Sequence, residues 1–230
     1  MADETCSERS LKEIREAAAR KSSGIYLAVV GMIEPLVLGY FLTQINVERL
    51  FGRSASAGYW LQGIAVLIVI VLVWHEFAMS SLCVVWVLDV FDFLFPLLLA
   101  IGQYVLIATL AAGKLQYWYF ALAGIALMCM LSLVFQALKI KGRGNDAEPE
   151  KCLCDCMPRL TVSIVPVCAG LSAAFGAVLL TVSATPSLEV LLLSITTAGL
   201  ATFGGFRFCA WKTFLSPATS CKRAPKSGSY

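Results

Sequence analysis

Apolar residues are gathered into six long runs, and the short segments between the runs contain most of the charged and turn-forming residues. An α-helix rises about 1.5 Å per residue, so about 20 apolar residues cross a hydrocarbon core about 30 Å thick. Each run is long enough for one crossing. The predicted membrane spans are 25–45, 58–77, 82–112, 117–138, 160–182 and 187–210.

The composition agrees with this pattern. Hydrophobic residues make up 59% of the chain and charged residues 14%, which is too apolar for a soluble domain. The predicted fold class is therefore all-α, a polytopic bundle of six transmembrane helices. This membrane domain covers 25–210, and the flanking segments 1–24 and 211–230 are polar.

The basic residues are distributed unequally between the two sides of the predicted bundle. Most of the 18 Lys and Arg residues lie before the first span, between the fourth and fifth spans, or near the end of the sixth. The exceptions are Arg49, Arg53 and Lys114. Because cytosolic loops of membrane proteins carry the excess of positive charge, both termini and the loop 139–159 are predicted to be cytosolic. Two termini on the same side require an even number of spans, and the predicted number of six agrees with this.

Aromatic residues give a second indication of the membrane boundaries. Tyr and Trp favour the two interfaces between lipid and water, so an aromatic belt is expected at each end of the bundle. The outer belt contains Tyr59, Trp60, Tyr117, Trp118 and Tyr119, and the inner belt contains Trp74 and Trp211.

A charged amphipathic helix is predicted ahead of the first span, over about 7–21. Ser10 and Glu13 have the spacing of a capping box, and acid–base pairs lie four residues apart. Its apolar stripe is thin, with Leu11, Ile14 and Ala18 on one face. The helix either lies on an anionic membrane surface or is a solvated lead-in.

The third run is longer than one crossing needs. A continuous helix over 82–112 would measure about 46 Å, so it is either strongly tilted or begins along the membrane surface. We favour the second interpretation, in which 82–92 lies at the cytosolic interface and the helix enters the membrane near Phe93.

Glu34 is the sharpest functional candidate because it stands halfway along the first span. An acidic side chain at this depth is costly and usually marks an ion path, a proton relay or a ligand site. Pro35 has no amide N–H, so the carbonyl oxygen of Gly31 loses its helical partner, and the three residues form a candidate site for a proton or a small cation. The alternative is a structural role, with a protonated Glu34 hydrogen-bonded to Gln103 or Gln62.

A second acidic group is predicted where the second and third spans meet the cytosol. It contains His75, Glu76, Asp89 and Asp92. One interpretation is a mouth that concentrates cations near Glu34, another is a metal site, and a third is a set of first-turn acids stabilised by helix dipoles. The chain has one histidine, which argues against the several-histidine sites of membrane metalloenzymes and against bis-histidine haem ligation.

Three cysteines, Cys152, Cys154 and Cys156, alternate along the predicted cytosolic loop. The spacing is not that of a zinc site, and no second pair follows it. Reversible acylation at the membrane surface is the alternative use.

The last three spans contain small residues at four-residue spacing, which allows membrane helices to approach closely. The rows are Gly170 with Ala174, Ala173 with Ala177, and Ser194 with Ala198 and Thr202. They suit packing inside one bundle or contacts between subunits of a homo-oligomer.

These patterns lead to a functional hypothesis. The leading one is an integral membrane channel or carrier for protons or small cations, with Glu34 as the binding group. The alternative is a non-catalytic sensor or scaffold that binds a cytosolic protein, and a membrane-embedded enzyme acting on lipid is a third. No phosphate-binding loop, nucleophile elbow or redox cysteine pair is present, so no cofactor is expected. The net charge of +3 is small, so no nucleic acid partner is expected.

Overall fold

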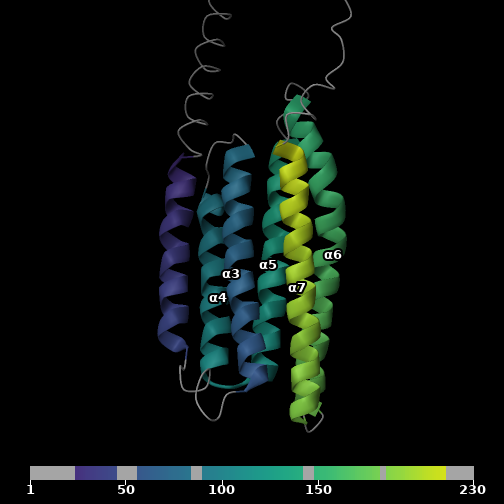
Figure 1. The fold of residues 1–230 in the computed structure, drawn as a ribbon. Coiled ribbons are helices and arrows are strands. Elements are labelled where there is room, and N and C mark those ends of the chain that lie inside the picture. Colours follow the sequence, from purple (N-terminus) through teal and green to yellow (C-terminus); the bar gives the residue numbers. More distant parts are fainter. Residues whose placement is uncertain (1–23, 46–55, 84–89, 142–147, 182–184, 216–230) are drawn as a thin grey trace, which may run out of the picture.

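The protein is described here from a computed structural model, which describes residues 24–45, 56–83, 90–141, 148–181 and 185–215. Within these ranges the chain forms six helices and no strand (Figure 1). The bounds are Gly24–Gln44 for the first described helix, Ala57–Cys83 for α3, Val90–Ala111 for α4, Leu115–Lys141 for α5, Glu148–Thr181 for α6 and Pro186–Leu215 for α7.

Five of the six helices are long and apolar enough to cross a membrane: the first described helix, α3, α4, α5 and α7. The all-α prediction is confirmed for the described residues, and the length and composition of these helices suggest an integral membrane protein. α6 contains a shorter apolar segment, Val165–Thr181, which would span about 26 Å. Its crossing of the membrane remains a prediction.

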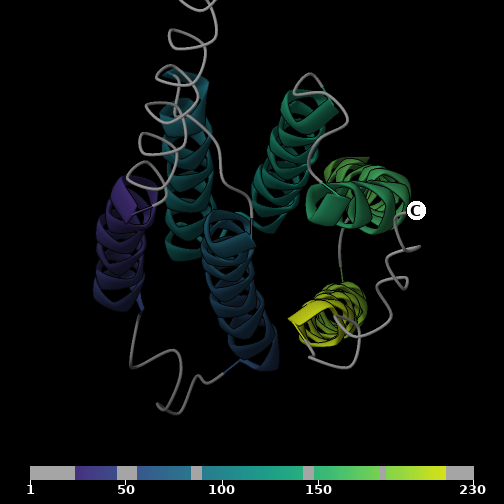
Figure 2. The ribbon, with the colours of Figure 1, turned by 90° about the horizontal axis from the view of Figure 1, so that it is seen from above.

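The helices run up and down through one bundle, so Gly24 and Leu215 lie at the same end (Figure 1). We call this the Gly24 end. Seen along the helices, the first described helix, α4 and α3 form one side, and α5, α6 and α7 form the other (Figure 2). α3 packs against α4 and α7, and α5 packs against α4 and α6. The two consecutive helices α6 and α7 therefore pack mainly on different neighbours.

One face of the first described helix packs into the bundle. Its buried residues recur every three or four positions, as expected for one helical stripe: Tyr26, Val30, Glu34, Val37 and Phe41. Aromatic contacts fix this helix to its neighbours. Tyr26 lies edge to face with Phe77 of α3, and Tyr40 stacks on Tyr104 of α4 with ring centroids 3.7 Å apart.

The turn between α4 and α5 is closed by a glycine in the left-handed conformation. Gly113 has φ of 68°, and its amide donates to the Leu110 carbonyl while the Lys114 amide donates to Thr109. This pair of bonds is the Schellman arrangement, which satisfies the last carbonyl groups of a helix.

α7 begins as its sequence predicts. The hydroxyl oxygen of Thr185 accepts a hydrogen bond from the Leu188 amide at 3.4 Å, and Pro186 occupies the first helical position. Glu189 is in the first turn, where an acidic side chain is favourable. The hydroxyl group of Thr185 therefore caps the start of α7.

The third predicted span is divided differently in the structure. α3 continues to Cys83, so residues 82 and 83 end the preceding helix, and α4 begins at Val90. The sequence pattern could not show this because apolar residues continue across the break. Asp92 is in the first turn of α4, where a helix begins favourably with an acid.

Helix replaces most of the predicted loop 139–159. Residues 139–141 belong to α5, and residues 148–159 form the first turns of α6. Pro149 does not interrupt the helix, because it falls in the first turn of α6, where a missing amide N–H breaks no helical hydrogen bond. The predicted N-terminal helix over 7–21 lies outside the described residues, as does the tail beyond Leu215.

The predicted outer aromatic belt is wrong for three of its members, of which Tyr59 is 8% exposed. Trp118 and Tyr119 are fully buried, and Tyr119 packs edge to face against Phe175 of α6. Tyr117 is exposed. Consecutive residues on a helix point about 100° apart, so three neighbouring aromatic residues cannot all face the membrane surface.

The predicted small-residue rows contribute little to the contacts inside this bundle. Gly170, Ala174, Ser194 and Ala198 are exposed. The close approach of α5 and α6 instead occurs at Gly176, where a Cβ atom would lie 3.1 Å from the Gln116 carbonyl oxygen. The close contact between α5 and α6 therefore depends on Gly176, which is not part of the predicted rows.

Candidate functional site

Glu34 is buried inside the bundle, on the face of the first described helix that packs against its neighbours. It is 7% exposed, and its Oε2 atom has no hydrogen-bond partner in the described part of the chain. The helix extends about ten residues, or about 15 Å, to either side of it. The carboxyl group therefore lies near mid-depth if this helix crosses the membrane.

The amide of Gln103 on α4 faces the Glu34 carboxyl without reaching hydrogen-bond geometry. Gln103 is completely buried, and neither its amide oxygen nor its amide nitrogen has a partner among the described residues. Gln62 of α3 is also buried, and its Nε2 atom has no hydrogen-bond partner among the described residues. Buried polar atoms are nearly always paired, so these atoms need an explanation.

The structure does not enclose Gly31 and Pro35 with Glu34. Both residues are exposed, whereas Glu34 is buried. A Cβ atom added at Gly31 would meet nothing within 4 Å, which confirms that this face of the helix has no close neighbour in the described structure. The carboxyl and the Gln103 amide, rather than the Gly31 carbonyl, form the polar interior here.

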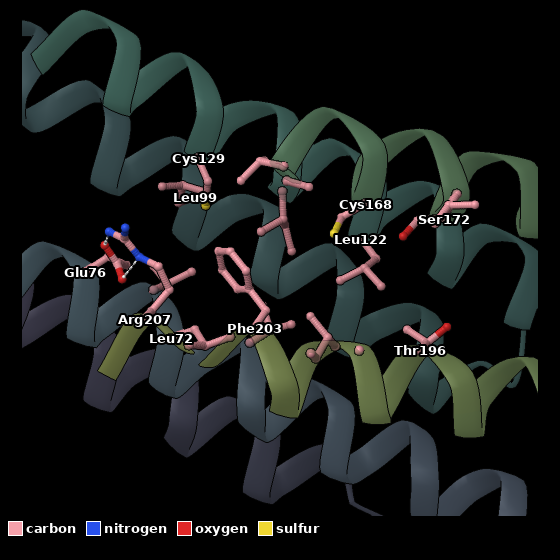
Figure 3. A pocket seen from close by; sticks show the side chains of 18 of the residues that line it. Leu72, Glu76, Leu99, Leu122, Cys129, Cys168, Ser172, Thr196, Phe203 and Arg207 are labelled. Atoms are coloured by element: carbon pink, nitrogen blue, oxygen red, sulfur yellow. Dashed lines mark hydrogen bonds and ion pairs between the residues drawn. The ribbon is translucent and has the colours of Figure 1, made fainter. Parts of the chain in front are cut away.

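The Gly24 end of the bundle holds an ion pair between Glu76 of α3 and Arg207 of α7 (Figure 3). Nε of Arg207 donates to Oε1 of Glu76 at 2.8 Å, and Nη2 donates to Oε2. The pair is bidentate, the geometry in which a guanidinium and a carboxylate bind most strongly. Nδ1 of His75 lies 3.8 Å from Oε1 of Glu76, too far for a hydrogen bond.

The other predicted acidic residues are placed separately. Asp92 of α4 is 5% exposed and interacts electrostatically with Tyr26 of the first described helix. Asp89 lies outside the described residues. Of the four predicted mouth residues, the structure brings together His75 and Glu76, and it places Asp92 on the side of the bundle that contains Glu34.

No metal centre is formed by the part of the chain that the structure describes, where no three His, Cys, Asp or Glu residues could hold one ion. Cys152, Cys154 and Cys156 lie on α6, but their side chains are outside the description. The acylation hypothesis for them is therefore untested.

The sequence analysis missed the partner of Glu76. Arg207 is one of the basic residues on which the predicted orientation rests, yet it is 4% exposed and paired with Glu76 inside the bundle. A signal was present in the sequence, because Arg207 lies within an otherwise apolar run and needs a partner there. What the sequence lacked was the neighbour relation between α3 and α7.

The comparisons with other proteins identify no relative. No known protein family, no curated protein and no solved structure matches this chain. The functional conclusion therefore depends on the site itself.

Proposed function

We propose that the protein moves protons across its membrane and that Glu34 is the group that binds and releases them. The observation that supports this most directly is a buried carboxyl group at mid-helix, with an oxygen atom that no described residue satisfies. An acidic side chain at the bilayer centre costs about 3 kcal/mol on insertion scales. A Glu34 kept only for packing would be expected to have its polar atoms paired.

Gln103 gives the proposed site a second polar group. Its amide can both donate and accept hydrogen bonds, and both of its polar atoms lack partners among the described residues. A fully buried amide of this kind is suited to order water molecules beside the carboxyl group. Water bound between Gln103 and Glu34 would give a proton a path to the carboxyl.

Asp92 is the described residue best placed to supply protons from the Gly24 end. It interacts with Tyr26, which lies eight residues before Glu34 on the same buried stripe, or about 12 Å along the helix. Glu76 is less suited to this task because its charge is offset by Arg207. Of the residues in the predicted acidic mouth, we therefore assign the proton entrance to Asp92 alone.

A proton fits this site better than a metal cation. Hard cations take six or more oxygen ligands in most protein sites. Among the described residues, no three His, Cys, Asp or Glu side chains come together at Glu34 to hold an ion. A proton needs one acceptor atom and a path.

The test is proton flux into liposomes that contain the purified full-length chain, measured with a trapped pH-sensitive dye. Glu34→Gln keeps the shape of the side chain but cannot titrate, and it is expected to lower the flux at least about tenfold. The matched control is Glu189→Gln, which removes a carboxyl group from the first turn of α7. The control should retain the parental flux.

A second variant tests the path rather than the carboxyl. Gln103→Leu removes the facing amide and should also slow the flux, while the melting temperature stays within a few degrees of the parent. Parental flux in Glu34→Gln would rule out the proposed role. Potassium flux without proton flux would overturn the proposal for protons and would indicate a path for small cations instead.

A further inference from the structure

A cavity of about 260 Å³ lies between α3, α5, α6 and α7 (Figure 3). Leu99 of α4 also lines it, whereas Glu34 and Gln103 do not. A cavity of about 150 Å³ in a protein core is large enough to hold benzene, so this one can hold a longer hydrocarbon group.

The interior of the cavity is apolar. Its walls are mostly aliphatic and aromatic side chains, and Phe203 of α7 points into it (Figure 3). The hydroxyl of Thr196, on the same wall, already donates to the Leu192 carbonyl at 2.9 Å. Such a space attracts a hydrocarbon chain and does not favour a polar solute.

The cavity opens sideways, between α6 and α7. Two of its lining residues, Leu171 on α6 and Ile195 on α7, are each 52% exposed. The opening follows from the packing, because α6 lies mainly against α5 and α7 against α3. In a membrane this side of the bundle meets lipid, so a lipid chain can enter without crossing water.

The Glu76–Arg207 pair forms the end of the cavity that lies toward the Gly24 end (Figure 3). Glu76 stands one residue before the end of the predicted span 58–77, and Arg207 stands three residues before the end of the predicted span 187–210. The pair therefore stands at the depth where hydrocarbon gives way to lipid headgroups. It offers one positive and one negative group side by side.

We propose that this cavity binds one acyl chain of a zwitterionic membrane phospholipid, with the headgroup against the Glu76–Arg207 pair. The phosphate is attracted to the guanidinium and the ammonium to the carboxylate, so the neutral pair matches a neutral headgroup with separated charges. Phosphatidylglycerol, an anionic phospholipid, has a phosphate but no ammonium group, so its headgroup offers no positive partner to Glu76.

The experiment uses the full-length protein in vesicles that contain a phosphatidylcholine with a photoreactive group near the end of one chain. Crosslinked peptides are identified by mass spectrometry. Crosslinks are expected at cavity residues such as Leu171, Ile195 and Phe203. Gly199→Leu is expected to reduce them about tenfold, which corresponds to about 1.4 kcal/mol. Gly199 lines the cavity, and an added side chain meets nothing within 4 Å.

The matched control is Gly205→Leu, on the same helix and equally open but outside the cavity lining. It should label like the parent. Cys168→Leu fills the cavity from α6 and replaces Gly199→Leu if that variant does not fold. Equal labelling of the parent and a folded cavity-filling variant would show ordinary surface lipid and overturn the proposal. Equal labelling by a phosphatidylglycerol with the same photoreactive chain would overturn the headgroup assignment.

The lipid proposal does not depend on proton movement. Gly199→Leu should lose lipid labelling and keep proton flux, whereas Glu34→Gln should lose flux and keep labelling. The failure of one proposal is therefore distinguishable from the failure of the other.

Discussion

Breaking the ion pair between Glu76 and Arg207 should destabilise the protein, and replacing both residues should cost much less than the two single changes together. The side chain of Arg207 is 5% exposed and that of Glu76 is 20% exposed, so neither charge is well solvated once its partner is removed. Removing one partner of a buried pair typically costs 3–5 kcal/mol, whereas replacing both by groups of similar size is often neutral.

The magnitudes follow from the difference in exposure. Arg207→Met leaves the better solvated carboxylate unpaired and should cost about 3 kcal/mol, while Glu76→Gln leaves the buried guanidinium and should cost about 4 kcal/mol. The double variant should cost about 1 kcal/mol, which corresponds to a coupling energy of about 6 kcal/mol between the two residues. For a chain of this size 3 kcal/mol corresponds to a decrease of about 6–12 °C in melting temperature.

The assay is equilibrium unfolding in mixed detergent micelles, with all four members of the cycle measured under the same conditions. His75→Gln is a useful comparison, because its ring is 3.8 Å from Glu76 and should contribute under about 1 kcal/mol. If the two single costs add within about 0.5 kcal/mol in the double variant, the pair is not coupled and the reasoning is refuted.

Two further predictions concern glycines at close approaches and turns. Gly176→Ala should lower the free energy of unfolding by about 1–3 kcal/mol, because the added Cβ lies 3.1 Å from a backbone oxygen of α5. Gly170→Ala is the control: its added Cβ meets nothing within 4 Å, so it should be neutral or slightly stabilising in thermal unfolding. Gly113→Ala should lower the free energy of unfolding by about 1–2 kcal/mol, because φ is 68° at this position. Gly113→Asn should recover part of that cost in the same assay, since asparagine tolerates the left-handed conformation. Equal melting temperatures for the Ala and Asn variants would contradict the conformational explanation.

The helices could be located from the sequence, because a membrane-spanning helix is a local property. Its length is set by the thickness of the hydrocarbon core, and all its backbone hydrogen bonds are internal. The predicted first, second, fourth and sixth spans each coincide with a described helix to within a few residues at most bounds. The burial of Glu34 follows from the same reasoning, since a carboxyl group at mid-span avoids lipid.

Two helix boundaries could not be located from the sequence. The third run continues across the boundary between α3 and α4, and the start of α6 is polar although it is helical. Between α3 and α4 one helix ends and another begins although the residues stay apolar. At the start of α6 the chain is helical although the residues are polar. Hydropathy alone therefore misplaced these two boundaries.

The sequence by itself determined the fold class, the positions of most helices and the identity of the buried acid. Only the tertiary structure decided which helices are neighbours. It paired Arg207 with Glu76, buried Trp118, and gave the close contact of α5 and α6 to Gly176. The physical reason is that lipid tails are as apolar as the residues inside a membrane bundle. A membrane helix is therefore apolar on every face, and hydrophobic periodicity does not show which face turns inward.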